Sequence, residues 1–105
     1  MASTIAYPHI VKENGRPARL ENHPRTRVAQ IVMDYLAYGW SAVEIHRQHA
    51  HLTLAEVHAA MGYYYDHQTE IDAEIPAELE EVDRALKNPT RSPVWVKLKA
   101  KGLIP

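Results

Sequence analysis

The chain of 105 residues contains no cysteine and no hydrophobic run of the roughly 18 residues that a membrane span requires. The absence of cysteine excludes disulfides, cysteine-ligated zinc, iron–sulfur clusters and thiol catalysis. No signal-peptide pattern opens the sequence, so we expect a soluble cytoplasmic protein without a membrane partner. Hydrophobic residues make up 46% of the chain and charged residues 24%, which is typical of one small globular domain.

Catalytic and metal-binding motifs are also scarce. Seven histidines are present, and three or four imidazoles from the following set could in principle hold zinc: His46, His49, His51 and His58. However, the sequence has no His-Glu-x-x-His pattern, and no motif frames a serine, threonine or lysine as a nucleophile. We therefore expect no enzymatic activity, no metal and no cofactor.

Charge is divided sharply along the second half of the chain. Residues 70–83 hold seven acidic side chains and no basic one, whereas residues 84–105 hold six basic side chains and no acidic one. One interpretation is a solvated acidic helix followed by a basic end. The other is a basic tail that meets an anionic partner, either phosphate or a cluster of carboxylates.

The first half of the sequence predicts a hairpin followed by helices. Asn14-Gly15 is a strong hairpin signal between short strands at 10–12 and 18–20. Apolar spacing indicates a helix over 27–38 that Gly39 ends. Two capping boxes follow: Ser41 with Glu44 opens a short helix that ends near His49, and Thr53 with Glu56 opens a long helix that runs to about Ile75.

The second half of the sequence predicts two further helices. Pro76 can begin a helix that ends at Asn88-Pro89, and Ser92-Pro93 can begin a last short helix that ends at Gly102. The stretch 94–98 also alternates between apolar and other residues, so an extended form is the alternative. We therefore expect a mobile segment at 1–9, a core over 10–75 and a helical extension over 76–105.

Two capped helices joined by a few residues, with a third helix before them, have the layout of a helix-turn-helix unit. We therefore predict a mainly α fold with a three-helix core, a short N-terminal β-hairpin and a C-terminal helical tail. A three-helix bundle without a nucleic-acid role has similar spacing and is the alternative. The expected DNA-binding residues are Arg16, Arg19, Arg25, Arg27, Thr53 and His58. Because the third helix carries no lysine or arginine, binding through that helix alone would be weak.

Several ordered blocks of the sequence resemble one prokaryotic family. The blocks are Gly15-Arg16-Pro17, residues 25–28, residues 37–45, residues 51–57 and the Tyr63–His67 segment. Over residues 10–72 the chain resembles domain-of-unknown-function family 433, which is similar to VapB-type antitoxins. The chain departs from the family pattern at His23-Pro24 and His49-Ala50. The resemblance implies a homeodomain-like fold, binding to promoter DNA and pairing with a PIN-type ribonuclease toxin.

The basic tail combines cations with apolar anchors, as a partner-binding segment requires. A PIN-type toxin, which the resemblance implies, carries an active-site carboxylate cluster that a tail cation could reach. The candidate residues are Arg91, Trp95, Lys97, Leu98, Lys99 and Lys101. The competing interpretation is that the tail folds back on the acidic 70–83 helix of its own dimer. We also expect a homodimer in which segment 10–20 contributes to the contact.

Three classes of function follow from these patterns. The leading prediction is a DNA-binding, antitoxin-like regulator without enzymatic activity, which represses its own promoter. The second is a protein-interaction or dimerisation module that does not bind DNA. The third, a metal-binding or hydrolytic protein built on the histidines, lacks a supporting motif.

Overall fold

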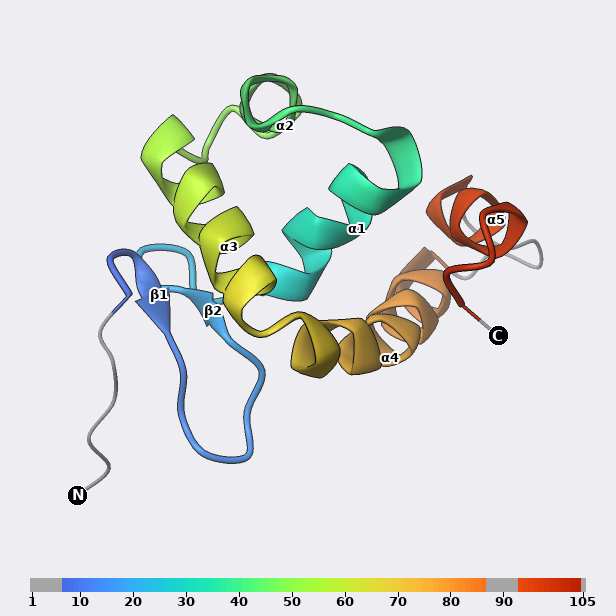
Figure 1. Cartoon of the computed structure of the whole chain (residues 1–105), viewed down its shortest axis with the longest axis horizontal. Coiled ribbons are helices and arrows are strands. Elements are labelled where there is room, and N and C mark those ends of the chain that lie inside the picture. Colours follow the sequence, from blue (N-terminus) through green and yellow to red (C-terminus); the bar gives the residue numbers. More distant parts are fainter. Residues whose placement is uncertain (1–6, 87–92, 105) are drawn as a thin grey trace.

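A computed structural model describes residues 7–86 and 93–104. These residues form a mainly helical structure with a small antiparallel sheet, as predicted (Figure 1). In chain order the elements are β1 (Ile10–Val11), β2 (Arg19–Leu20), α1 (Val28–Tyr38), α2 (Ala42–Gln48), α3 (Leu54–Asp66), α4 (Gln68–Leu86) and α5 (Pro93–Ala100). No described helix is both long enough and apolar enough to cross a membrane.

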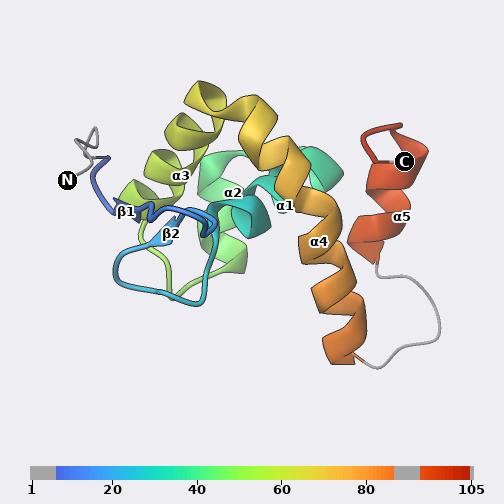
Figure 2. The same ribbon diagram turned by 90° about the horizontal axis from the view of Figure 1, so that it is seen from below.

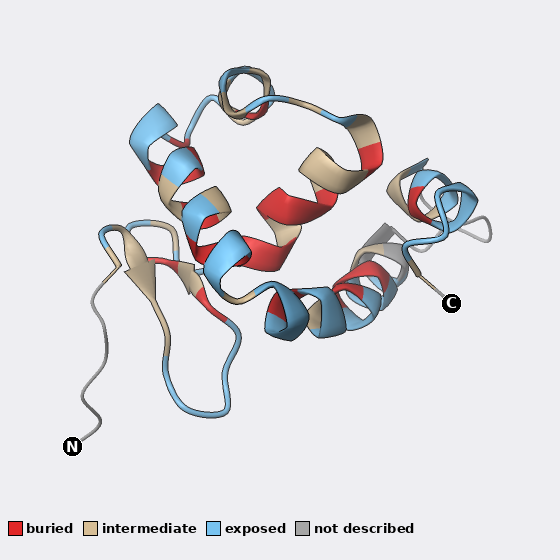
Figure 3. Cartoon of the chain, viewed as in Figure 1, coloured by how far each residue is buried: buried red, intermediate tan, exposed pale blue. Residues whose placement is uncertain are grey.

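Helix α1 lies at the centre of the fold and packs against the other four helices (Figure 1). Its buried positions are Val28, Ala29, Ile31, Val32, Met33 and Ala37. A helix that is apolar around so much of its circumference has to be covered on several sides. Figure 3 shows the buried positions gathered where α1, α3 and α4 meet.

The predicted hairpin forms, with Ile10 opposite Leu20 and Val11 opposite Arg19. Its loop spans 12–18, however, and is longer than the two-residue turn that Asn-Gly typically makes. Gly15 has a φ of 77°, a conformation that glycine adopts without a Cβ clash. The strands are short, but Leu20 is fully buried in the core, so the hairpin is stabilised by packing on the helices.

The part of the predicted mobile segment that the structure describes is anchored to α3. The Tyr7 ring packs edge-on against Tyr63, with 4.9 Å between ring centroids, and its hydroxyl donates a 2.5 Å hydrogen bond to Asp66. Tyr7 also contacts the ring of His67. Within the predicted mobile segment, Tyr7 thus contacts the end of α3, and residues 1–6 lie outside the described residues.

Helices α1 and α2 form where predicted, with one difference at the start of α2. Ser41 Oγ accepts a hydrogen bond from the Glu44 amide at 3.2 Å, as a capping residue does. The Glu44 carboxylate does not complete the predicted capping box, because it accepts hydrogen bonds from Arg47 and Gln48, both at 2.8 Å. Gly39 ends α1 in the left-handed conformation, with a φ of 67°, as expected.

The predicted boundary between the long helix and the next one is wrong. Helix α3 ends at Asp66, and α4 then runs through Pro76 without a new start. An apolar stripe on α4 explains this: Ile71, Ile75 and Leu79 repeat every four residues and are all buried. Burial of one continuous stripe outweighs the hydrogen bond that proline removes. The predicted helix end at Asn88-Pro89 lies outside the described residues.

The predicted last helix forms as α5, so the extended alternative for 94–98 is wrong. Leu98 is fully buried, and Val94, Trp95 and Ile104 pack against the same core. Figure 2 shows α5 running beside the α1–α4 body. Helix α5 therefore forms part of the folded unit rather than a solvated end.

A buried leucine on α5 predicts how much the tail stabilises the domain. We expect Leu98→Ala to lower the free energy of unfolding by about 2–5 kcal/mol, because it leaves a cavity in the core. Val96→Ala, at a position on the same helix that is 52% exposed, should change it by about 0.5 kcal/mol or less. Urea denaturation followed by circular dichroism measures both. Equal effects of the two variants would contradict the docking of α5.

Candidate nucleic-acid interface

Helices α2 and α3 pack together across a short turn at 49–53. The turn is held by a 2.7 Å contact between His46 Nδ1 and the Leu52 carbonyl oxygen, and by the burial of the Leu52 side chain. The predicted capping box at Thr53 is confirmed. Its hydroxyl accepts from the Glu56 amide at 3.1 Å, and its own amide donates to Glu56 Oε1 at 2.8 Å. The direction of α3 is therefore fixed at its first residue.

One side of α3 is open to solvent and carries small side chains. Thr53, Ala55, His58 and Gly62 are exposed on it, whereas Val57 and Tyr64 are buried. A Cβ added at Gly62 would meet no atom within 4 Å, so this part of the helix surface is not covered by the described chain. Two larger side chains, Leu54 and Tyr65, are also exposed on α3.

The loop 21–26, which carries the exposed Arg25, lies against the start of α3. In the same loop, His23 Nε2 lies 3.6 Å from Glu56 Oε1, and the His23 ring lies 5.3 Å from that of His51. These contacts fix the loop against the first turn of α3. Arg16, by contrast, is carried by the loop 12–18, which projects from the hairpin on the side away from α2 (Figure 1).

The other two predicted arginines are engaged within the chain. Arg19 pairs with Glu13 at 2.5 Å. Arg27 binds the Glu78 carboxylate through Nε and through Nη2, the latter at 2.9 Å, and this pair raises the pKa of Arg27. Arg19 and Arg27 are therefore held by carboxylates of the chain itself, and Arg27 joins the start of α1 to α4.

Three glutamates, Glu70, Glu74 and Glu78, repeat every four residues along α4, and two of them pair with basic side chains. Glu70 pairs with Lys12 at 3.8 Å, and Glu78 pairs with Arg27. Glu74 lies between them, and its buried Oε1 has no hydrogen-bond partner among the described residues. Burial raises the pKa of Glu74; Lys12 opposes this shift, and the charges of Glu70 and Glu78 add to it.

The raised pKa predicts a pH-dependent effect of Glu74→Gln. A carboxyl with a raised pKa holds its proton more tightly in the folded state, so its ionisation destabilises the fold as pH rises above the ordinary glutamate range. The variant should therefore be more stable than the parent near neutral pH, by about 1 kcal/mol or less because the group is partly screened by solvent.

The difference should shrink as pH falls toward about 4, where both states carry the proton. Thermal unfolding at several pH values measures it. The matched control is Glu21→Gln, which removes the same charge from an exposed loop position. A destabilising effect of Glu74→Gln at neutral pH would contradict this account.

The histidines gather around the α2–α3 turn without forming a ligand cage. His49 Nε2 lies 2.7 Å from Asp34 Oδ2 on α1, and the rings of His49 and His51 are 6.2 Å apart. Burial raises the pKa of Asp34, and the contact with His49 opposes the shift. Among the described residues, no group of three or more histidine, aspartate and glutamate side chains could hold a metal ion.

The predicted partner-binding residues of the tail are divided between core and surface. Leu98 is fully buried and Trp95 is half-buried in the chain's own fold, so Leu98 is not available as a partner anchor in this arrangement. Lys97 Nζ lies 5.5 Å from the Tyr38 ring centroid, and Lys101 Nζ donates to the Leu36 carbonyl oxygen at 3.0 Å. Lys99 is exposed, and Arg91 lies outside the described residues.

Within the single chain the tail docks on α1. The competing interpretation placed it on the acidic 70–83 helix of its own dimer, because the charges of the two segments are opposite. Apolar burial around Leu98 and the attraction of Lys101 to the carbonyl end of α1 account for the observed position.

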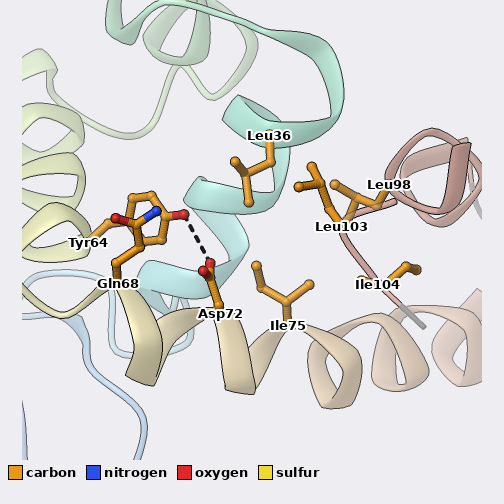
Figure 4. Close-up of a pocket in the computed structure, with 8 residues that line it drawn as sticks. All are labelled: Leu36, Tyr64, Gln68, Asp72, Ile75, Leu98, Leu103 and Ile104. Atoms are coloured by element: carbon orange, nitrogen blue, oxygen red, sulfur yellow. Dashed lines mark hydrogen bonds between the residues drawn. The ribbon is translucent and has the colours of Figure 1, made fainter. Parts of the chain in front are cut away.

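Docking of the tail leaves a cavity of about 160 Å³ between α1, the α3–α4 corner and the chain end (Figure 4). Its lining residues are Leu36, Tyr64, Gln68, Asp72, Ile75, Leu98, Leu103 and Ile104. At its polar side the Tyr64 hydroxyl donates to Asp72 at 3.0 Å, and burial together with this bond raises the pKa of Tyr64 to about 12. Apart from Tyr64, Asp72 and Gln68, the lining is apolar.

Residues 22–64 match the family described as "Protein of unknown function (DUF433)". The match covers the loop before α1 together with α1, α2 and most of α3, and so includes the α2–α3 unit and Arg25. It supports the resemblance drawn from the sequence blocks and leaves α4 and α5 outside it. Comparison with curated proteins and with solved structures gives no match.

Proposed function

We propose that the chain is a small DNA-binding regulator of the antitoxin type, with no enzymatic activity, in which α1–α3 act as a homeodomain-like helix-turn-helix unit. The observation that carries the proposal is the α2–α3 pair: a rigid turn, a capped α3 and an open helix side with small residues. In such units the second helix of the pair enters the major groove, and its first residues face the base edges.

In this proposal Thr53 and His58 lie nearest the bases, and Arg25 contacts a phosphate beside them. Affinity of one copy for DNA is low because α3 has no lysine or arginine of its own. We propose that a homodimer and a PIN-type toxin partner supply the missing affinity, so that the chain represses its own promoter as part of an assembly.

The experiment measures binding to a fluorescein-labelled duplex taken from the DNA upstream of the coding sequence, by anisotropy over a range of salt concentrations. Arg25→Ala should weaken binding and make the slope of log K against log salt shallower by about one. Arg16→Ala is the matched control, since it removes an exposed arginine on the hairpin loop, on the side away from α2 (Figure 1). Equal losses in the two variants would contradict the proposed orientation.

A protein-interaction module without DNA binding is the second candidate. It is favoured by three large apolar side chains left exposed on α2 and α3: Val43 (46% exposed), Leu54 (37%) and Tyr65 (55%). Self-association measured by sedimentation velocity, together with no DNA shift at low salt, would support this candidate. Because Ala18 and Leu20 are fully buried, deletion of the hairpin would damage the core, so dimerisation is best measured on the whole chain.

A further inference from the structure

We propose that the histidines around the start of α3 form a rim that contacts the DNA phosphates and strengthens binding as it becomes protonated. The rim consists of His23, His49, His51 and His58. The inference rests on the proposed DNA-binding function. It concerns a different source of affinity for DNA, namely the positive charge that the histidines carry when they are protonated.

The rim draws its residues from three parts of the chain, and ring contacts join three of its four histidines. His23 comes from the loop before α1, His49 and His51 from the α2–α3 turn, and His58 from the second turn of α3. Ring contacts join His23 to His51 at 5.3 Å and His51 to His49 at 6.2 Å. The two ends of this row meet carboxylates, Glu56 at 3.6 Å and Asp34 at 2.7 Å.

These two carboxylates decide what protonation does at the rim. Glu56 is 2% exposed and Asp34 is largely buried, and each lies against a histidine. When the imidazoles are neutral, both carboxylates place uncompensated negative charge close to the surface that would face phosphates. When His23 and His49 are protonated, the two ion pairs become neutral, and the repulsion is removed.

His51 and His58 then contribute net positive charge. Both side chains are exposed, and neither has a carboxylate contact of the kind that His23 and His49 make. Protonated imidazoles are donors at both ring nitrogens and can hydrogen-bond phosphate oxygens. Because imidazole ordinarily changes its charge between pH 5 and 8, the rim converts a pH change into a change of affinity.

The other charged groups around the rim do not supply net positive charge. The loop before α1 carries Glu21 and Arg25, α1 carries Asp34, and His9 acts on Glu56 from the segment before β1. On α2, Glu44 and Arg47 form an ion pair with each other at 2.8 Å. The fixed charges near the rim are therefore balanced or negative, and added positive charge comes from the histidines.

The experiment measures the affinity of the whole chain for the same labelled duplex at about pH 8 and about pH 6, at fixed ionic strength. These values bracket the ordinary titration of imidazole. We expect affinity to rise about tenfold or more at the lower pH, and the salt slope to steepen by about one for each histidine that contacts a phosphate. Circular dichroism confirms that the chain is folded under both conditions.

Two sets of variants separate the rim from a general effect of pH. His51→Gln with His58→Gln should abolish most of the pH dependence, whereas His51→Arg with His58→Arg should give tight binding at both pH values. The matched control is His67→Gln, at the opposite end of α3, where the imidazole stacks on Tyr63 at 4.1 Å. This control should retain the pH dependence of the parent chain.

The outcomes distinguish this inference from the proposed function. Salt-dependent DNA binding that is equal at both pH values would overturn the rim and leave the DNA-binding proposal in place. The absence of binding at either pH, including by the double arginine variant, would overturn both. Loss of the pH dependence in His67→Gln to the same extent as in the double glutamine variant would also overturn the rim.

Discussion

The whole fold depends on the need to cover α1. Six of its residues are buried, and they lie around most of the helix circumference. Helix α3 covers one side, α4 a second and α5 a third, so elements from the whole chain meet on one short helix. This constraint explains why α5 is docked on α1 although residues 84–105 hold six basic side chains and no acidic one. The hairpin adds Ala18 and Leu20 to the same core.

Electrostatic contacts then set how the covering elements are aligned. Arg27, at the start of α1, binds Glu78 on α4. Because the Glu78 carboxylate is buried, removal of Arg27 alone would leave an unpaired buried charge and destabilise the fold. Glu74, whose buried oxygen has no partner in the described part of the chain, indicates that the row on α4 holds more negative charge than Lys12 and Arg27 neutralise. The apolar core thus fixes which elements meet, and the ion pairs favour one alignment among them.

Local sequence signals predicted the elements well, and long-range contacts limited what they could predict. Thr53 with Glu56 and Gly39 are signals read within a few residues, and both gave the correct helix ends. Pro76 is also a local signal, but burial of Ile71, Ile75 and Leu79 against α1 outweighs it. That burial depends on a partner helix about forty residues away in the chain, which no local rule includes.

The same limit applies to the candidate site. The sequence identified Arg25, Thr53 and His58, and the structure leaves all three exposed. It also included Arg27, whose carboxylate partner is 51 residues away and has no local signature. His23 and Asp34 were missed for the same reason, because their importance comes from contacts with Glu56 and His49. Charge counted along the sequence therefore overestimated the cations that are free to meet DNA.

A surface with so few free cations has a consequence for how such a regulator would work. Phosphate contacts dominate affinity for DNA, and each one contributes in proportion to the counterions it releases. One copy with Arg25 as its fixed contact at the helix would bind weakly, but joining two copies makes the second contact intramolecular and multiplies the affinity. Occupancy of DNA would then depend steeply on assembly and on the charge of the surrounding imidazoles. A protein with a strongly basic recognition helix lacks that dependence, because a single copy already binds DNA of any sequence.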